Sequence, residues 1–338
     1  MKPRVKPCLF LVFATGLAAA QSSTTTYMKD LNGNRADGQS FSTNANGERT
    51  ERYQSINGRQ VPLEQTVDRV ISQDANGKVT ERIVRKFDSN GQPASTERVM
   101  IEESKLPGGS STVRETTYRS DINGTQREAE RRTIETRVDG STTTANTVID
   151  RPTLNGSLET IEKRSAVTDG PADNQHTTES VYRRAVSGGF QEALRTVKTA
   201  SKVNDATKET TANYEPGIDG QLQLASQSDS TTTKQPDGTQ VTQTDLFAKT
   251  VAGNVQDSSG RMRVKEEQVV QRRTNPDGSV VETFSVRRPS VSDPNRLGDL
   301  QKLSETVCKG KCAPDQLPPP DPKPNVDPTK SATGSSRP

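Results

Sequence analysis

Residues 111–124 read STVRETTYRSDING, and this stretch contains the pattern that decides the fold. From Thr112 to Arg119 successive side chains alternate in kind, with Val113, Glu115 and Thr117 on one face. A period of two indicates a β-strand, whereas a helix repeats every 3.6 residues. Asn123-Gly124 follows at once, and this dipeptide is a strong short-range signal for a hairpin turn. The stretch therefore predicts a strand that turns back on itself.

The same turn signal recurs along the chain, with seven Asn-Gly and six Asp-Gly pairs. From Gly91 onward most of the punctuating glycines are 14 to 18 residues apart. Where the spacing doubles, between Gly188 and Gly220, Asn204-Asp205 lies at the midpoint and predicts a further turn. We therefore expect an all-β fold, an extended antiparallel meander of hairpin repeats at about 16-residue spacing.

Some segments fit this scheme less simply. Prolines at 62, 93 and 152, together with bulges, are expected to interrupt the longer strands. Phe190 to Lys202 fits either a helix face or a strand, and the repeat favours the strand. Asp293-Pro294 has the form of a helix N-terminus, and the leucines at 297, 300 and 303 with Val307 follow at near-helical spacing. A short C-terminal helix is therefore predicted there.

The first twenty residues have the three parts of a secretory signal peptide: a basic start, the apolar run CLFLVFATGL and small residues before the cleavage point. Cleavage after Ala20 would leave Gln21 as the new N-terminus. The apolar run is too short for a spanning helix, and we expect no transmembrane span in the mature chain. The chain is thus expected to be exported to the periplasm, the cell surface or the exterior.

Four segments follow from these patterns. They are a signal peptide (1–20), a β-hairpin-repeat region (21–290), a short helix with a Cys-x3-Cys loop (291–313), and a disordered proline-rich tail (314–338).

Composition narrows the range of functions. Hydrophobic residues make up 28 % of the chain and aromatic residues 4 %, which is too little to fill thick cores. The signal peptide removes three basic residues from 46 Lys and Arg, which leaves a formal balance with the 43 Asp and Glu. A formally neutral chain offers no bulk attraction for nucleic acid. An outer-membrane barrel also ranks low, because it needs apolar lipid-facing positions and aromatic girdles.

Few residues suggest chemistry. Cys308 and Cys312 predict a local disulfide in an oxidising compartment, with half of an intermolecular metal site or free thiols as alternatives. His176, the single histidine, lies in a polar stretch and is expected to face solvent. The Asp-x-Asn-Gly turns at Asp74 and Asp121 lack the further acidic ligand of a calcium loop, so plain turns are expected. We predict no catalytic residue, no metal and no cofactor.

One turn carries a resemblance. The run Phe87-Asp88-Ser89-Asn90-Gly91-Gln92 resembles the turn of YD/RHS-type β-repeats, although most copies lack the tyrosine and the following Gly-Arg. Over most of its length the chain is similar to uncharacterised exported bacterial proteins with Thr-rich β-hairpin repeats, through the blocks 151–160 (RPTLNGSLET) and 304–308 (SETVC). That resemblance implies no activity.

The function expected from the sequence is a non-enzymatic structural or interaction protein of the cell envelope or exterior, with an extended sheet as its working surface. The alternative is a carbohydrate-binding or adhesion module. A secreted hydrolase and an outer-membrane barrel rank below both. The partner expected is an envelope polysaccharide or another envelope protein.

Overall fold

The computed structural model describes residues 22–29, 35–44, 47–56, 59–121, 123–186, 188–249, 262–290 and 296–310. These residues form a β-meander and, apart from the 3-10 turn η1 (Pro107–Gly109), contain no helix. The first nine strands are β1 (Ser22–Lys29), β2 (Arg35–Asn44), β3 (Gly47–Ile56), β4 (Arg59–Gln73), β5 (Gly77–Phe87), β6 (Pro93–Lys105), β7 (Ser111–Ser120), β8 (Gln126–Asp139) and β9 (Thr142–Pro152). The next nine are β10 (Leu158–Asp169), β11 (Asn174–Arg184), β12 (Phe190–Val203), β13 (Ala206–Pro216), β14 (Leu222–Lys234), β15 (Gln240–Lys249), β16 (Met262–Thr274), β17 (Val280–Arg287) and β18 (Gln301–Lys309).

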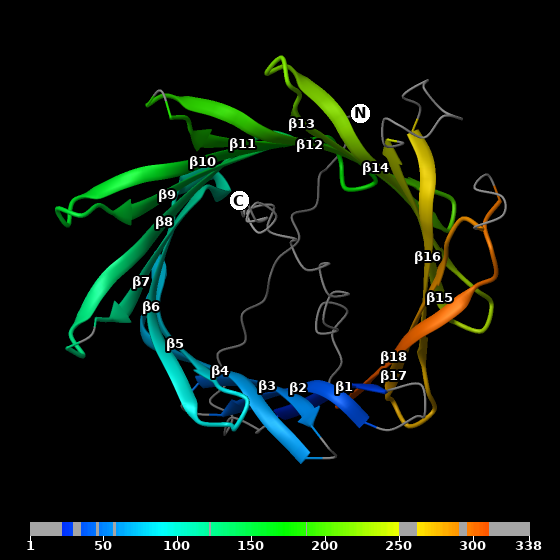
Figure 1. Cartoon of the computed structure of the whole chain (residues 1–338), viewed down its shortest axis with the longest axis horizontal. Helices are drawn as coiled ribbons and strands as arrows, with labels where there is room; N and C mark the ends of the chain where they lie inside the picture. Colours follow the sequence, from blue (N-terminus) through cyan, green and yellow to red (C-terminus); the bar gives the residue numbers. More distant parts are fainter. Residues whose placement is uncertain are drawn as a thin grey trace, which may run out of the picture.

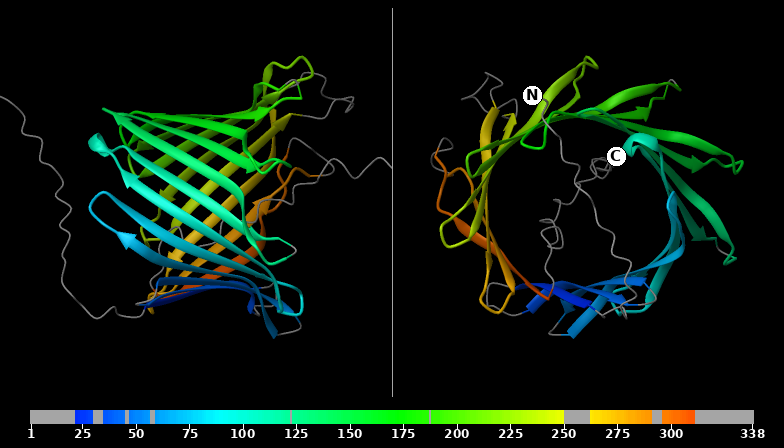
Figure 2. Two further views of the ribbon diagram at one scale, coloured as in Figure 1. Left: turned by 90° about the vertical axis from the view of Figure 1, so that its left-hand side faces the viewer. Right: turned by 180° about the vertical axis from the view of Figure 1, so that it is seen from behind.

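Each strand pairs antiparallel with the next along the chain, and the last strand pairs with the first. At this seam Thr25 stands opposite Lys309 and Lys29 opposite Glu305. The 18 strands therefore close into a barrel, and Figure 1 shows them as a ring seen end on. Figure 2 shows the strands tilted across the wall, as closure of a sheet requires. The all-β antiparallel meander is confirmed, but it closes into a barrel and does not form the extended sheet expected from the sequence.

The hairpin turns explain the glycine spacing. In the β7–β8 turn the Gly124 N–H donates to the Asp121 carbonyl oxygen and the Asp121 N–H donates to that of Thr125, both at 2.9 Å. Gly124 has a φ of 79°, whereas Asn123 before it does not have a positive φ. This is a three-residue loop closed by a left-handed residue, which glycine adopts without strain. Asn204 is the one described non-glycine residue with positive φ, and it occupies the turn expected there.

The aspartate that opens such a turn also fastens it. Asp121 Oδ1 accepts the N–H groups of Asn123 at 2.9 Å and Thr125 at 3.0 Å, and Oδ2 pairs with Arg127 at 3.0 Å. The pKa of Asp121 is held below its usual range, chiefly by the hydrogen bond from the backbone N–H of Thr125 and further by Asn123 and Arg127. The carboxylate is therefore better stabilised in the folded chain than in the unfolded one.

This lowered pKa has a consequence for stability against pH. A group whose pKa falls on folding contributes stability above its unfolded pKa, and that contribution is lost as the pH falls through the folded pKa. Asp121→Asn should therefore lower the melting temperature at pH 7, and the gap to wild type should shrink once the pH drops below about 4. Thermal melts of both proteins from pH 7 to pH 2 measure it. A gap that stays constant across this range would contradict the assignment.

The prolines and the ambiguous segment can now be placed. Pro62 lies inside β4, beside a register shift against Arg52 and Tyr53, so the strand bulges there and is not broken. Proline begins β6 and ends β9 at positions 93 and 152. The segment Phe190–Val203 is strand β12, as the repeat predicted.

Two expectations from the sequence fail in the structure. The predicted C-terminal helix is not found in its described part, because Gln301–Lys309 forms β18 and hydrogen-bonds to β1 and β17. Asp37-Gly38 is not a turn but lies within β2, where Gly38 pairs with Tyr27 and Tyr53. The predicted signal peptide at 1–20 and proline-rich tail at 314–338 lie outside the described residues.

Little apolar surface is buried. Among the described residues, Cys308 (0 % exposed) and Val286 (2 %) have the most deeply buried apolar side chains, and Val307 and Val280 are nearly as covered. All four lie on β17 and β18, next to the seam. The small core thus gathers where the barrel closes, while the ladder hydrogen bonds hold the rest of the wall.

Candidate functional site: the barrel lumen

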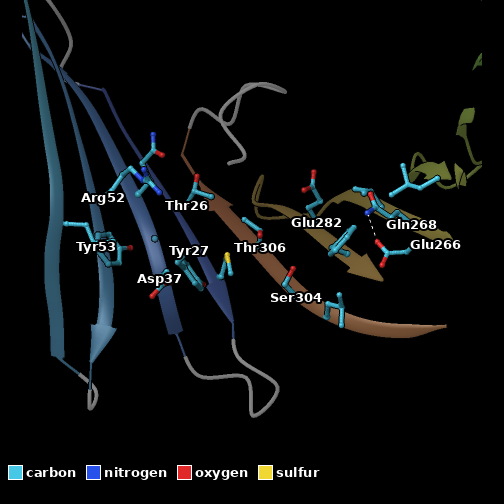
Figure 3. A pocket seen from close by; sticks show the side chains of 18 of the residues that line it. Thr26, Tyr27, Asp37, Arg52, Tyr53, Glu266, Gln268, Glu282, Ser304 and Thr306 are labelled. Carbon is cyan, nitrogen blue, oxygen red and sulfur yellow. Dashed lines mark hydrogen bonds between the residues drawn. The ribbon is translucent and has the colours of Figure 1, made fainter. Parts of the chain in front are cut away.

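A cavity of about 730 Å3 opens on one face of the wall at the seam. Its lining residues come from eight strands that are neighbours around the barrel, β15 to β18 and β1 to β4. Most of its lining side chains, such as Thr26, Gln39 and Glu282, belong to one face of the sheet, and we assign that concave face to the lumen. Tyr27, Gly38 and Tyr53, which belong to the alternate set, also border the cavity. Thr26, Thr306 and Glu282 project to that side from three strands (Figure 3).

The strand register extends this assignment around the barrel. Residues directly opposite each other in a sheet share a face, and successive residues alternate. Thr26 pairs with Cys308 and Gln39, and Glu282 pairs with Thr306 and Arg272, so all of these face inward. When these pairings are followed from strand to strand, the residues of every described strand divide into an inward-facing set and an outward-facing set.

The inner face is polar and rich in ion pairs. Opposite charges meet there across neighbouring strands. The inner pairs include Arg82–Asp68 (2.6 Å), Lys198–Glu209 (2.7 Å), Arg151–Glu130 (2.8 Å), Arg119–Glu97 (2.9 Å), Arg183–Glu162 (3.1 Å) and Arg132–Glu115 (3.5 Å). Pairs this exposed contribute from nothing to about 1 kcal/mol each. Their main effect is to give the lumen a charged, wettable wall.

Within the cavity one carboxylate is buried and fully bonded. Glu266 is 3 % exposed, accepts Gln268 Nε2 at 2.7 Å through Oε1, and accepts Arg288 Nε at 2.8 Å through Oε2. A buried charge is tolerated when it is paired and hydrogen-bonded in this way. Figure 3 shows Glu266 and Gln268 joined at the edge of the cavity.

The outer face has a feature that the sequence analysis missed. Of the ten aromatic residues in the described part of the chain, strand alternation assigns eight to the outer set, and all eight lie within three residues of a strand end at the same rim. Two of them, Tyr27 and Tyr53, also border the cavity at the seam. We call this set the aromatic rim; it consists of Tyr27, Tyr53, Phe87, Tyr118, Tyr182, Phe190, Tyr214 and Phe247. All five tyrosines of the protein belong to it.

The aromatic rim is held by cross-strand contacts on the outer face. The Arg98 guanidinium lies 5.9 Å from the centre of the Tyr118 ring, and Lys163 Nζ lies 4.6 Å from that of Phe190. Such cation–π contacts contribute about 0.5–1 kcal/mol at exposed sites. Tyr53 lies over Gly38, where a Cβ atom would come within 2.6 Å of the tyrosine Cζ.

Below this rim the outer face is mixed. Apolar residues such as Ile83 and Val269 alternate around the wall with ion pairs. The outer pairs include Arg98–Glu81 (2.6 Å), Lys29–Glu305 (2.7 Å), Arg287–Glu267 (3.4 Å) and Arg114–Glu102 (3.9 Å). The outer wall therefore lacks a continuous apolar band over the described strands.

The residues singled out from the sequence are not brought together. Cys308 is buried and disulfide-bonded, but Cys312, Ala20 and Gln21 lie outside the described residues, so the Cys308–Cys312 pairing and the cleavage site stay predictions. His176 lies on the outer face of β11, exposed, with Thr178 Oγ1 at 3.4 Å from Nε2. Across the residues with assigned positions, no cluster of three potential metal ligands occurs.

No helix among the described residues is long and apolar enough to cross a membrane.

The sequence expectation of a structural or adhesive protein that works through the face of an extended sheet is wrong. The pairing of β18 with β1 closes that sheet, so one face becomes a lumen lining and the other an outer wall. The barrel architecture, ranked low from the sequence, is the one that the chain adopts.

No protein-family model matches this chain, and no curated protein matches it. Among solved structures, the chain is similar to Salmonella typhi OmpF in complex with daunomycin, at 7 % identity and a TM-score of 0.43, over 86 % of this chain and 96 % of that one. It is also similar to OmpT, an outer membrane protein of Vibrio cholerae, at 7 % identity and a TM-score of 0.41, over 85 % and 95 % of the two chains. At these scores the two likenesses carry no functional conclusion.

Proposed function

We propose that this protein is a pore-forming barrel of the cell envelope that gives small hydrophilic solutes a path through its lumen. The observation that carries the proposal is the closure of 18 strands around a charged inner face. Barrels of 16 to 18 strands are wide enough to leave an aqueous channel. Polar, ion-paired walls keep such a channel wet.

The aromatic rim supports a place in a membrane. Tyrosine and phenylalanine gather at membrane–water interfaces, since the ring suits the acyl boundary and the hydroxyl suits the headgroups. In this barrel eight aromatics lie on the outer face at one rim, whereas only Phe41 and Phe284 of the described aromatics face inward. A sheet in water has no reason to sort its aromatics to one face and one end.

Bilayer conductance tests the proposal. Residues 21–338, refolded in detergent and added to a planar lipid bilayer, should give stepwise increases in ion current. A chain that ends at Leu300 lacks β18 and serves as the control, because it retains most of the composition but cannot close. Folded wild-type protein that never conducts, over a wide range of protein concentration, would overturn the proposal.

A second candidate is a barrel bathed in water on both faces, which holds a polar solute in its lumen. The outer ion pairs at mid-strand favour it, because an Arg or Lys on the lipid face at the bilayer midplane costs about 2–4 kcal/mol. Vesicle flotation separates the two candidates. Protein that stays monodisperse without detergent and does not float with liposomes supports the water-bathed barrel, whereas flotation supports the pore.

A further inference from the structure

One carboxylate in the lumen cavity has no bonded partner. Glu282, the third residue of β17, faces the cavity and is half-buried. Among the residues that the structure describes, none donates a hydrogen bond to its carboxylate and none lies within ion-pair distance. Arg272 stands opposite it across β16–β17 and exerts only a longer-range attraction.

The other charges around the cavity are already engaged or distant. Glu266 is bonded to Arg288 and Gln268, and Asp37 Oδ1 accepts the Ser55 N–H at 3.3 Å. Arg52 stands directly opposite Glu64 on the far side of the cavity, four strands from β17. At the usual strand spacing, that separation is about 19 Å. Glu282 is therefore the open charge at its end of the cavity.

Apolar side chains surround this open charge. Phe284 is the next inward-facing residue on β17, and Val270 stands opposite it on β16. Leu303 and Leu246 line the same cavity from β18 and β15. A ring and three aliphatic side chains next to an unbonded carboxylate form a mixed surface, and the ring face can also attract a cation. Binding pockets combine an apolar lining with a few placed polar groups in this manner.

We propose that the part of the cavity lined by β15 to β18 is a binding site for a small organic cation, an amine with an apolar or aromatic body. Its ammonium group would donate to the Glu282 carboxylate, and its body would lie on Phe284, Val270 and Leu303. The volume of about 730 Å3 admits a ligand of drug-like size. The site deepens the proposed pore function by giving the lumen a preference for cations, but binding does not require a pore.

Calorimetry on the folded full-length mature chain tests this site. The probes are 2-phenylethylamine, which is cationic at pH 7, its neutral isostere 2-phenylethanol, and the anion phenylacetate. The amine should bind measurably, the alcohol at least about tenfold more weakly and the anion not at all, because a hydrogen bond to a charged group is worth about 1.5–3 kcal/mol.

Two variants and one control sharpen the test. Glu282→Gln keeps the shape and removes the charge, so amine affinity should fall at least about tenfold to the level of the alcohol. Phe284→Leu should weaken both the amine and the alcohol. Glu103→Gln, an inward-facing glutamate on β6 away from the cavity, should leave all three affinities unchanged. Circular dichroism of each variant confirms that it is folded.

The outcomes separate this site from the pore. Equal binding of amine and alcohol, or an amine affinity that Glu282→Gln leaves intact in a folded protein, would overturn the site even if the barrel conducts ions. Amine binding that depends on Glu282 supports the site even if the protein gives no ion current in the bilayer.

Discussion

A chain that ends at Leu300 is expected to lose the barrel, because β18 joins the two ends of the meander. Without Gln301–Lys309 the five registered pairs with β1 and the seven with β17 disappear. Val307 and Cys308, which are among the most buried residues, go with them. At a net value of about 0.5–1.5 kcal/mol per hydrogen bond, these ladders alone approach the 5–15 kcal/mol by which domains are stable.

Far-UV circular dichroism melts and limited proteolysis measure this effect. The matched control ends at Ala313 and retains β18 while dropping the proline-rich tail, so it should melt as the full mature chain does. Truncations at Leu300 and Ala313 that melt alike would show that the seam is not needed.

Gly38→Val, on the strand next to the seam, is expected to be strongly destabilising. A Cβ atom at Gly38 would meet Tyr53 Cζ at 2.6 Å and the Thr26 carbonyl oxygen at 2.7 Å. The tyrosine can move, but the carbonyl belongs to the β1–β2 ladder and cannot move without breaking the pairing. Overpacking of this kind costs about 1–3 kcal/mol, and the backbone clash places this site at the upper end.

The control for this substitution is Gly189→Val, because a Cβ atom there meets nothing within 4 Å. It should leave the free energy of unfolding nearly unchanged in urea titrations. Adding Tyr53→Ala to Gly38→Val should recover part of the loss and not all of it, since the Thr26 carbonyl remains. Full recovery would mean that the ring alone sets the cost.

The strands and turns of this fold were predictable because both depend on local chemistry. The alternation around Val113 and the glycine at 124 each act within a few residues, and the structure has a strand and a turn there. Asp37-Gly38 shows the limit of this reasoning. The dipeptide looks like a turn in isolation, but Tyr53 from the next strand uses the missing Cβ to lie across it.

Closure was not predictable in the same way. Both faces of the strands contain Thr, Arg and Glu, so no apolar face indicates which side turns inward. The seam is also remote, since Lys29 and Glu305 are 276 residues apart. The helix predicted near Leu303 failed for the same reason, because a distant strand supplied the partner that made β18 a strand.

The aromatic rim did leave a signal in the sequence. Tyr53, Phe87 and Tyr118 follow one another at 34 and 31 residues, and Tyr182, Tyr214 and Phe247 at 32 and 33. Two turn spacings of about 16 residues make one hairpin, so residues at this interval return to the same end of a meander. Strand alternation then sets the face. The spacing of the aromatic residues thus predicts that they gather on one face at one end of the meander, which the spacing of the glycines alone does not predict.

The seam also has a consequence for the order of folding. Hairpins along the meander can form as soon as their two strands are available, but the first strand must wait for the last one. Contacts between remote residues form slowly, since the entropy of loop closure must be overcome first. Until then the free edge of β1 can pair with another chain, and a paired edge of this kind leads to aggregation. An exported chain with this topology would therefore need its first strand kept apart until its last strand arrives.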